Sequence, residues 1–266
     1  MPGKSAAPKQ RAATHIEVRD LTMAYADFVI QRDLNFTIWQ GDIFVIMGGS
    51  GCGKSTLLRH LIGLKTPAKG EIYYHGEAFW QLPEDRRQDL MRRMGVLYQS
   101  GALWGNMTLA ENISLPIETY TDLSPLQARE LATYKLSLVG LKGFEDYLPA
   151  EISGGMQKRA GLARAMALDP ELLFFDEPSA GLDPVSAKRL DDLIIELSES
   201  LGTTIVVVTH ELASIFAIGN NSVFLDPECK TMIAHGNPSE LLQSCSDPRV
   251  QAFLTRGANA SSTSGS

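Results

Sequence analysis

The sequence has little cysteine, no long apolar run and no excess of basic residues. Its three cysteines, Cys52, Cys229 and Cys245, are too few and too widely separated for a disulfide framework or a cysteine-based metal cluster. Such sparse cysteine is typical of a reducing, cytosolic compartment. No stretch reaches the roughly 18 consecutive apolar residues of a membrane helix, and residues 1–14 lack the apolar core of a signal peptide. Action at a membrane would therefore require a partner that holds the chain there.

The balance of charge is acidic. The 266 residues include 31 Asp and Glu against 24 Lys and Arg, which gives a net charge of −7. Proteins that bind nucleic acid need a basic face for the phosphates, so we expect no nucleic-acid partner. Hydrophobic residues make up 44% of the chain and charged residues 21%, which is an ordinary globular composition. The length suffices for one large α/β domain or two small ones.

Several short segments have the hydrophobic pattern of strands. Residues 15–18 and 35–38 alternate apolar and polar side chains, as half-buried antiparallel strands do. Residues 43–47, 172–175 and 204–208 are almost continuously apolar, which is typical of strands buried on both faces of a sheet. A helix is predicted directly after the first of these runs, over residues 55–64.

The middle of the chain has a different pattern. Residues 85–165 are mostly amphipathic and helical, with a strand signal at 95–98. We interpret this stretch as a helical subdomain inserted into an α/β core. One domain is therefore expected over residues 15–245, preceded by a flexible tail (1–14). It is followed by a C-terminal segment, 246–266, whose Ser-, Ala- and Gly-rich end cannot bury a core.

A glycine-rich loop carries the clearest chemistry. Residues 48–55 fit the pattern G-x-x-x-x-G-K-[ST], after a predicted buried strand and before a predicted helix. Glycines let backbone N–H groups converge on phosphate oxygens, and the helix N-terminus adds a positive dipole. Lys54 is expected to reach the β- and γ-phosphates, and the Ser55 hydroxyl to ligate Mg²⁺. The alternative is a glycine-rich turn in an unrelated α/β protein. The predicted phosphate-binding residues are Gly48, Gly49, Ser50, Gly51, Cys52, Gly53, Lys54, Ser55 and Thr56.

Cys52 occupies a variable position of this loop. A helix N-terminus lowers a thiol pKa, so a redox-sensing cysteine is one interpretation. The other is that a small residue simply fits there.

Two acids follow the apolar run at 172–175. Asp176 should lie at the carboxyl end of its strand, the edge where parallel α/β sheets bind ligands, and support Mg²⁺ directly or through water. Glu177 points elsewhere and is the candidate for polarising an attacking water. An exposed acidic turn after a strand is the plainer alternative, and the phosphate loop in the same chain argues against it.

The segment that narrows the class comes before a predicted helix. Ser153, Gly154 and Gly155 offer a hydroxyl, unobstructed backbone donors and a helix dipole to an anion. Together with Ile152 they resemble the signature sequence of ATP-binding-cassette (ABC) proteins, usually written LSGGQ. Met156 departs from that pattern, because a Gln is usual at its position, and we expect altered rates rather than lost function.

Other family landmarks follow in order along the chain. The resemblance implies that Tyr25 stacks on adenine, although an ordinary aromatic at a strand edge is the alternative. It also implies that Gln99 senses Mg²⁺ and faces a membrane partner, and that residues 180–183 contact an opposite subunit. His210, after the run at 204–208, matches the histidine that contacts the γ-phosphate.

The resemblance covers about residues 15–245 and implies the ABC nucleotide-binding domain. This fold has a RecA-like P-loop NTPase core, an antiparallel β subdomain and an inserted helical subdomain. The family binds and hydrolyses ATP with Mg²⁺ as two subunits. Each ATP is clamped between the phosphate loop of one copy and the signature residues of the other, so the partner expected first is a second copy of this chain. The resemblance assigns catalysis to Glu177, His210, Gln99 and Lys54, and metal binding to Ser55, Gln99 and Asp176.

Further segments resemble the Mla/Mkl group of ABC ATPases. These are residues 99–104 after the basic stretch 91–94, residues 152–159, and residues 247–254. The group powers MCE-type lipid transporters. It therefore implies a transmembrane permease, an MCE-domain protein, a small regulatory subunit of the STAS type, and a place on the cytoplasmic face of a bacterial inner membrane. The apolar residues 101–104 either contact the permease or belong to the core.

Two other functions stay open. The first keeps the transport ATPase but changes the cargo, to import of polar amino acids or export of lipophilic compounds. The second is a soluble ABC protein of DNA repair or translation that moves no solute. The single cassette and the acidic balance argue against the second. In some family members a C-terminal extension embraces the neighbouring subunit, whereas this chain ends in a Ser-rich stretch after Arg256.

Overall fold

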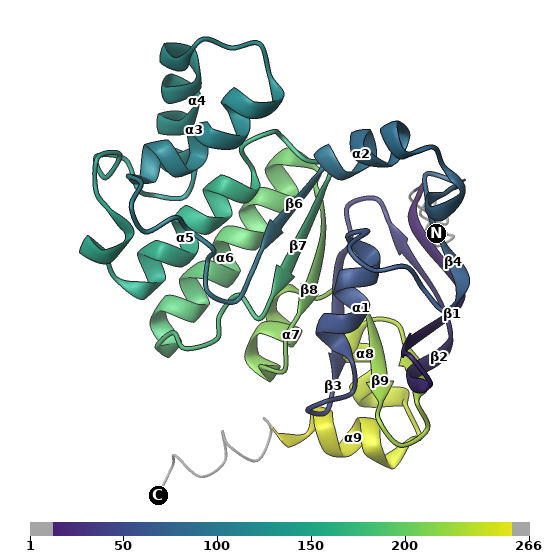
Figure 1. The fold of residues 1–266 in the computed structure, drawn as a ribbon. Coiled ribbons are helices and arrows are strands. Elements are labelled where there is room, and N and C mark those ends of the chain that lie inside the picture. The colour runs from purple at the N-terminus through teal and green to yellow at the C-terminus, as the bar shows by residue number, and fades with distance from the viewer. Residues whose placement is uncertain (1–12, 257–266) are drawn as a thin grey trace, which may run out of the picture.

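Two β-sheets form the centre of the part of the chain that the computed structural model describes, residues 13–256 (Figure 1). The larger sheet has the order β10-β9-β3-β8-β7-β6, and the smaller has the order β2-β1-β4-β5. The strands of the larger sheet are β3 (Ile43–Gly48), β6 (Met94–Leu97), β7 (Leu172–Asp176), β8 (Thr204–Val208), β9 (Asn221–Asp226) and β10 (Thr231–His235). Those of the smaller sheet are β1 (Thr14–Tyr25), β2 (Phe28–Trp39), β4 (Lys69–Tyr74) and β5 (Glu77–Ala78).

The larger sheet is parallel apart from β10, and helices and the smaller sheet cover its faces. Every residue of β3 is buried. Phe44 and Ile46 pack toward α1 (Lys54–Leu61) and the antiparallel sheet, whereas Val45 and Met47 pack toward α7 (Leu212–Ile218) on the other face. Burial on both faces explains why the strands read as continuous apolar runs in the sequence.

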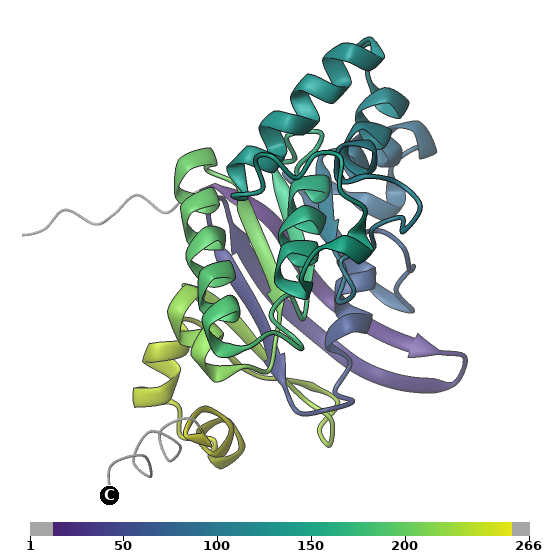
Figure 2. The ribbon, with the colours of Figure 1, turned by 90° about the vertical axis from the view of Figure 1, so that its left-hand side faces the viewer.

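The face of the parallel sheet opposite α1 is covered by α5 (Gly154–Ala165) and α6 (Pro184–Leu201), as Figure 2 shows. Leu173 and Phe175 of β7 pack into this helical layer. The alternating neighbours Leu172 and Phe174 pack on the α1 side.

The stretch predicted to be helical contains four α-helices and one strand. Of these, α3 (Leu109–Tyr120) and α4 (Pro125–Leu138) lie at one end of the molecule and pack against each other and α5 (Figure 1). Both begin with a capping box, Thr108 with Glu111 and Ser124 with Gln127. The other helices are α2 (Glu84–Arg92) and α5, and β6 pairs with β7 in the central sheet. Two short 3₁₀ helices, η1 (Phe79–Gln81) and η2 (Pro149–Glu151), complete the middle of the chain.

The C-terminal helices pack back onto the core. They are α8 (Pro238–Ser244) and α9 (Pro248–Leu254). The Phe253 ring of α9 lies edge-on to Phe224 of β9, with 5.1 Å between the ring centroids. Val250 and Leu254 are buried in the same apolar cluster as Met47. The chain up to Arg256 is thus fixed near the carboxyl end of β3. Residues 1–12 of the predicted N-terminal tail (1–14) and the predicted tail at 257–266 lie outside the described residues, whereas Thr14 is the first residue of β1.

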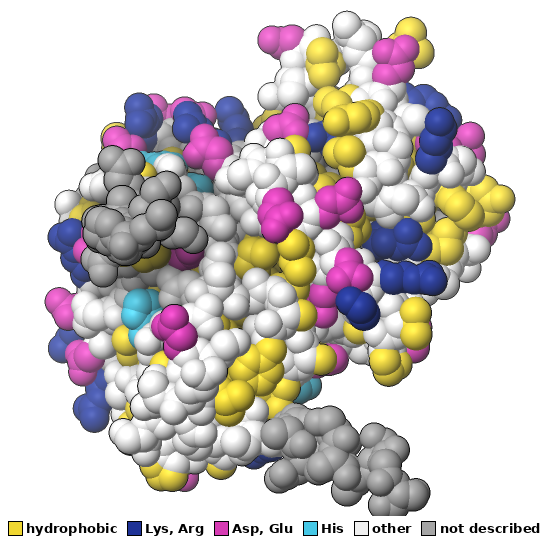
Figure 3. All heavy atoms as spheres, turned by 180° about the vertical axis from the view of Figure 1, so that it is seen from behind, with side chains coloured by type: hydrophobic (Ala, Val, Ile, Leu, Met, Phe, Trp, Pro, Cys, Tyr) yellow, Lys and Arg dark blue, Asp and Glu magenta, His cyan; other side chains and the backbone are white. Residues whose placement is uncertain are grey.

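Charges of both signs are interspersed over much of the face seen in Figure 3. Within residues 13–256, none of the helices combines the length and apolarity needed to span a bilayer.

Candidate nucleotide-binding site

The glycine-rich loop connects β3 to α1, and its backbone needs glycine. Gly48 has φ +147°, and a Cβ there would lie 2.3 Å from the Leu225 carbonyl oxygen. Gly53, the residue before α1, has φ +98°, and its Cβ would lie 2.6 Å from Cγ2 of Ile30. Any side chain would push the loop away from β9 and β2. The sequence therefore fixes a tight turn that exposes backbone N–H groups at a helix N-terminus, which suits an anion.

Lys54 and Cys52 point in different directions from this loop. The Lys54 ammonium donates to the carbonyl oxygens of Gly48 and Gly49, at 3.0 and 3.1 Å. The Cys52 side chain is 1% exposed and lies in the core, and burial raises the pKa of its thiol. A buried thiol with a raised pKa is unreactive, so the structure favours the interpretation of Cys52 as a small residue that fits.

Ser55 and Asp176 meet beside the loop. The Ser55 hydroxyl donates to Oδ1 of Asp176 at 3.0 Å. Asp176 ends β7, two strands from β3 in the sheet, and the carboxyl ends of these parallel strands share one edge. A hydroxyl and a carboxylate are hard oxygen ligands of the kind that Mg²⁺ prefers, so the pair fits a magnesium ion.

Glu177 and His210 form a second pair at the same edge. Nδ1 of His210 lies 2.8 Å from Oε1 of Glu177. Glu177 has φ +51°, and its N–H donates to the carbonyl oxygen of Val208 at 2.8 Å. Such a left-handed backbone is strained for a glutamate and is common at functional sites. The strained turn directs Glu177 away from Asp176, the direction predicted from the sequence, and toward His210, a pairing that the sequence did not predict. Oε2 of Glu177 is buried and has no hydrogen-bond partner among the described residues.

A cavity of about 740 Å³, which we call the nucleotide pocket, lies at the glycine-rich loop. The predicted residues that line it are Gly48, Gly49, Ser50, Gly51, Gly53, Lys54, Ser55, Thr56, Gln99, Glu177 and His210. Tyr25, Cys52 and Asp176 are not among the lining residues. Tyr25 is about half exposed, and the Lys65 ammonium lies 2.8 Å from its ring centroid. Lys65 is also the main reason why the pKa of Tyr25 is lowered.

Five further residues line the nucleotide pocket that sequence reasoning missed. They are Phe28, Ile30, Leu212, Phe253 and Arg256. Phe28 and Ile30 belong to β2, and Leu212 begins α7 two residues after the predicted His210. Arg256 and Phe253 reach the pocket only because α9 packs against β9. Phe253 belongs to the segment 247–254 noted for its family resemblance, but nothing in that segment or at Arg256 indicated a place in the pocket.

The signature residues lie elsewhere in the same chain. Ser153 precedes α5 as its N-cap, and its hydroxyl accepts from the N–H of Met156 at 3.3 Å. Ser153 and Gly154 are exposed, and Gly155 lies beside Ser186 of α6. The nucleotide pocket is not lined by Ser153, Gly154 or Gly155. Met156 packs against the helical core, so its side chain is partly withdrawn from solvent.

Helix α5 also holds the loop that carries Gln99. The Lys158 ammonium donates to the Gln99 carbonyl oxygen, and Arg164 donates to that of Ala102. Burial lowers the pKa of Lys158. Gly161 permits the close approach, because a Cβ there would lie 2.7 Å from the Gly101 carbonyl oxygen. Helix α5 thus contacts the loop that carries Gln99 and begins at the signature residues.

A glycine loop that joins a buried parallel strand to a helix, with an acid at the end of a nearby strand, defines the P-loop class of nucleoside triphosphatases. Within that class, the family model described as ABC transporter matches residues 31–180. Since this match spans more than half of the sequence, the chain belongs to the ABC transporter family of ATP-binding proteins. Membership implies binding and hydrolysis of ATP.

Curated relatives cover most of the chain. The intermembrane phospholipid transport system ATP-binding protein MlaF of Haemophilus influenzae is 41% identical over 239 residues, 90% of this chain and 89% of its own length. MlaF of Escherichia coli K12 is 39% identical over 246 residues, 92% of this chain and 90% of its own. The probable ribonucleotide transport ATP-binding protein mkl of Mycobacterium tuberculosis is 39% identical over 239 residues, 90% of this chain and 66% of its own. The predicted resemblance to the Mla/Mkl group is confirmed.

Solved structures agree on the fold. The ATP-binding cassette MJ0796, solved as a dimer in a post-hydrolysis state with ADP and Pi, is 28% identical with a TM-score of 0.75. It covers 84% of this chain and 98% of its own. The cbiO1 protein of Clostridium perfringens has a TM-score of 0.80 at 24% identity, covering 94% and 96% of the two chains, and bears on the fold alone. The predicted ABC nucleotide-binding fold is confirmed.

Proposed function

We propose that this chain is the ATP-hydrolysing subunit of a transporter that moves phospholipids or related lipids, and that it works as a pair of identical subunits bound to a membrane permease. The observation that carries the catalytic part is the nucleotide pocket, which gathers Lys54, Ser55, Gln99, Glu177 and His210 around the glycine loop. The proposed lipid cargo is supported by the names of the two MlaF relatives, which are phospholipid transport proteins.

Each group in the nucleotide pocket has a role that its chemistry suits. Backbone N–H groups of the loop and the Lys54 ammonium bind the phosphates of ATP. Ser55 and Asp176 hold Mg²⁺, with Gln99 beside them, and a bound Mg²⁺ would offset charge on the phosphate oxygens. Glu177 orients the attacking water and accepts its proton, and His210 fixes the carboxylate and reaches toward the γ-phosphate. Tyr25 stacks on adenine from the end of β1.

The pocket of a single chain lacks the signature residues, and this supports a site shared between two copies. Ser153, Gly154 and Gly155 face solvent or α6 rather than the chain's own phosphate loop. In the proposed pair, each copy presents them to the γ-phosphate bound by the other. The dimeric state of the solved cassette relative supports the same arrangement.

A second cavity supports docking of a permease. This apolar groove has a volume of about 740 Å³ and lies between β6, α5 and the loop after Gln99. Its lining includes Tyr98, Trp104 and Tyr120, which are 38%, 54% and 54% exposed. Leu103 packs on the helical core, so the predicted apolar patch is divided between core and surface. Exposed aromatics around a groove favour a protein partner.

The remaining partners follow from the same assignment. We propose an MCE-domain protein and a small STAS-type subunit as further members of the complex, at the cytoplasmic face of an inner membrane. Transport of another cargo is the second candidate, because the mkl relatives are named for ribonucleotide transport.

The test uses a Glu177→Gln chain purified from membranes in detergent. Loss of the carboxylate should lower ATP hydrolysis by about 10²- to 10⁴-fold while ATP still binds, and the pair should stay closed on ATP. We expect mass spectrometry of this trapped complex to find a six-helix permease and an MCE-domain protein. The control is Glu211→Gln, a glutamate next to His210 outside the pocket lining, which should turn over normally. Normal hydrolysis by Glu177→Gln would remove Glu177 from the mechanism, and a dimer carrying only nucleic acid would contradict the transporter assignment.

A further inference from the structure

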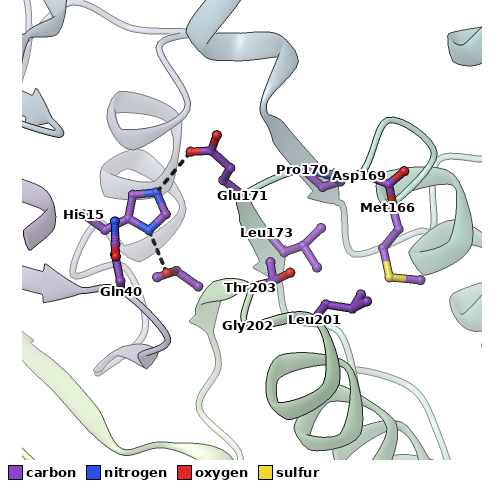
Figure 4. A pocket seen from close by; sticks show the side chains of 11 residues that line it. His15, Gln40, Met166, Asp169, Pro170, Glu171, Leu173, Leu201, Gly202 and Thr203 are labelled. Carbon is purple, nitrogen blue, oxygen red and sulfur yellow. Dashed lines mark hydrogen bonds and ion pairs between the residues drawn. The ribbon is translucent and has the colours of Figure 1, made fainter. Parts of the chain in front are cut away.

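A group of metal-ligating side chains lies far from the nucleotide pocket, where the two sheets meet. His15 of β1, His75 of the turn between β4 and β5, and Glu171 just before β7 each place one ligand atom within 4.8 Å of the others. We call these three residues the histidine cluster. His15 and Glu171 also line a separate cavity, drawn in Figure 4, which shares no residue with the nucleotide pocket.

We propose that the histidine cluster is a binding site for one zinc ion. Two imidazoles and one carboxylate are a donor set typical of zinc, with a fourth position left for water. By contrast, Ser55 and Asp176 offer only hard oxygens. The two sites therefore differ in the cation that they favour.

The distances fit this geometry. Nε2 of His75 lies 3.1 Å from Oε2 of Glu171, and Nε2 of His15 lies 3.9 Å from the same oxygen. In a tetrahedral zinc site with bonds of about 2.0–2.1 Å, ligand atoms are about 3.3 Å apart. The His75 and Glu171 atoms are close to this separation, and an inward shift of His15, whose ligand atom lies within 4.8 Å of the other two, would complete the set.

An unpartnered buried atom points to the ligand. His15 is 3% exposed, and its Nε2 has no hydrogen-bond partner among the described residues. Its other nitrogen, Nδ1, lies 2.7 Å from the Thr204 hydroxyl, and Figure 4 shows the His15 ring directed toward Glu171. A histidine fixed through one nitrogen presents the other to a metal, which is the usual second contact of a zinc-bound histidine. A buried nitrogen without a partner costs free energy that an ion would recover.

The surroundings hold the cluster together. The N–H of His75 donates to the carbonyl oxygen of His15 at 3.0 Å, so the turn is anchored to β1. Arg93 lies 3.3 Å from Oε1 of Glu171, which leaves Oε2 for the ion. A zinc ion here would cross-link the antiparallel sheet to the first residue before β7.

The experiment is a zinc titration of the full chain, purified without a histidine tag, stripped with EDTA and free of nucleotide. We expect one saturable site per chain by calorimetry, tetrahedral visible bands when Co²⁺ replaces zinc, and a rise in Tm with zinc. His75→Gln changes an exposed residue and so should fold, and it should weaken zinc binding by more than about 10-fold, the lower end of the loss seen when a supporting contact alone is removed.

The matched control is His210→Gln. His210 is an exposed histidine beside a glutamate, like His75, but no third His, Cys, Asp or Glu ligand joins the pair within residues 13–256. This variant should keep the zinc site. Absence of a saturable site in the unchanged chain, or equal loss of zinc binding in the two variants, would overturn the proposal. Since the assay contains no ATP, its failure would leave the proposed ATPase function untouched.

Discussion

Asp191 is a buried carboxylate whose charge is poorly compensated. It is 6% exposed in α6, and Oδ2 accepts from the Ser214 hydroxyl at 2.8 Å. Oδ1 has no hydrogen-bond partner among the described residues. Burial raises the pKa of this carboxyl above its ordinary 3.8. The folded chain therefore keeps the proton to a higher pH than the unfolded chain does. The stability contributed by Asp191 is fully present below pH 3.8 and is lost as the pH rises through the folded pKa.

We expect Asp191→Asn to remove this pH dependence. The free energy of unfolding of the unchanged chain, minus that of the variant, should fall as the pH rises from about 4 to 8, by on the order of 1 kcal/mol. Urea unfolding at several pH values measures this difference. Asp192→Asn is the control, because its carboxylate is exposed and pairs with Lys188 on the helix surface. A difference that stays flat with pH would show that Asp191 does not titrate as its burial requires.

The sequence predicted the position of individual residues where that position depends on a single strand. The glycine loop, Asp176 and Glu177 lie at the carboxyl ends of apolar parallel strands, and these ends share one edge of the sheet. The pairing of His210 with Glu177 was not predicted, because it depends on how two neighbouring strands align. Arg256 could not be predicted at all, since its place in the nucleotide pocket depends on the packing of α9.

Among helices and strands, buried runs were easier to place than boundaries. The runs at 43–47, 172–175 and 204–208 correspond to β3, β7 and β8. These strands are covered on both faces, so nearly all of their residues are apolar and the run is easy to identify. The two short antiparallel segments extend to twelve residues each as β1 and β2. Their outer parts carry bulges and mixed exposure, which hide the alternation in the sequence.

Helix α5 links the signature residues at its start to the Gln99 loop, which borders both the nucleotide pocket and the apolar groove. The link is the bond from the buried Lys158 ammonium to the Gln99 carbonyl oxygen. Lys158→Met keeps the apolar stem but removes that donor. We expect hydrolysis to fall by about 10-fold, because the Gln99 loop loses its hydrogen bond from a charged donor. ATP affinity should change by less than about threefold, because the phosphate loop is untouched.

Stopped-flow nucleotide binding and steady-state phosphate release would separate these two effects. The matched control is Lys135→Met in α4, where an equally buried lysine pairs with Asp169 away from the nucleotide pocket. If the two variants lost activity to the same degree, general destabilisation rather than the α5 link would account for the loss.

The proposed pairing of two chains follows from where the fold places the two halves of the site. The nucleotide pocket is built at the carboxyl edge of the parallel sheet, whereas Ser153 stands exposed at the start of α5. One rigid chain therefore does not bring its own signature residues to its own phosphate loop. Closure of two copies would place both at each ATP and exclude all water except the attacking molecule.

Mixing two defective chains tests this arrangement. Lys54→Ala removes the phosphate contact of one copy, and Ser153→Arg blocks the signature of the other. In the mixed pair, one composite site keeps an intact Lys54 and an intact Ser153, and the other site has neither. We expect about half of the normal ATP trapping from mixed pairs and almost none from either variant alone, measured with labelled ATP.

Ser153→Arg also removes the N-cap of α5, which alone costs about 1 kcal/mol. Ser124→Arg is the matched control, because Ser124 caps α4 at an exposed position away from the nucleotide pocket. Paired with Lys54→Ala, it should trap ATP as well as the mixed pair does, and it should also trap ATP alone. Full trapping by Ser153→Arg alone, or turnover at the normal rate by an isolated single chain, would mean that each nucleotide is held by one copy. The proposed coupling of hydrolysis to subunit closure would then fail.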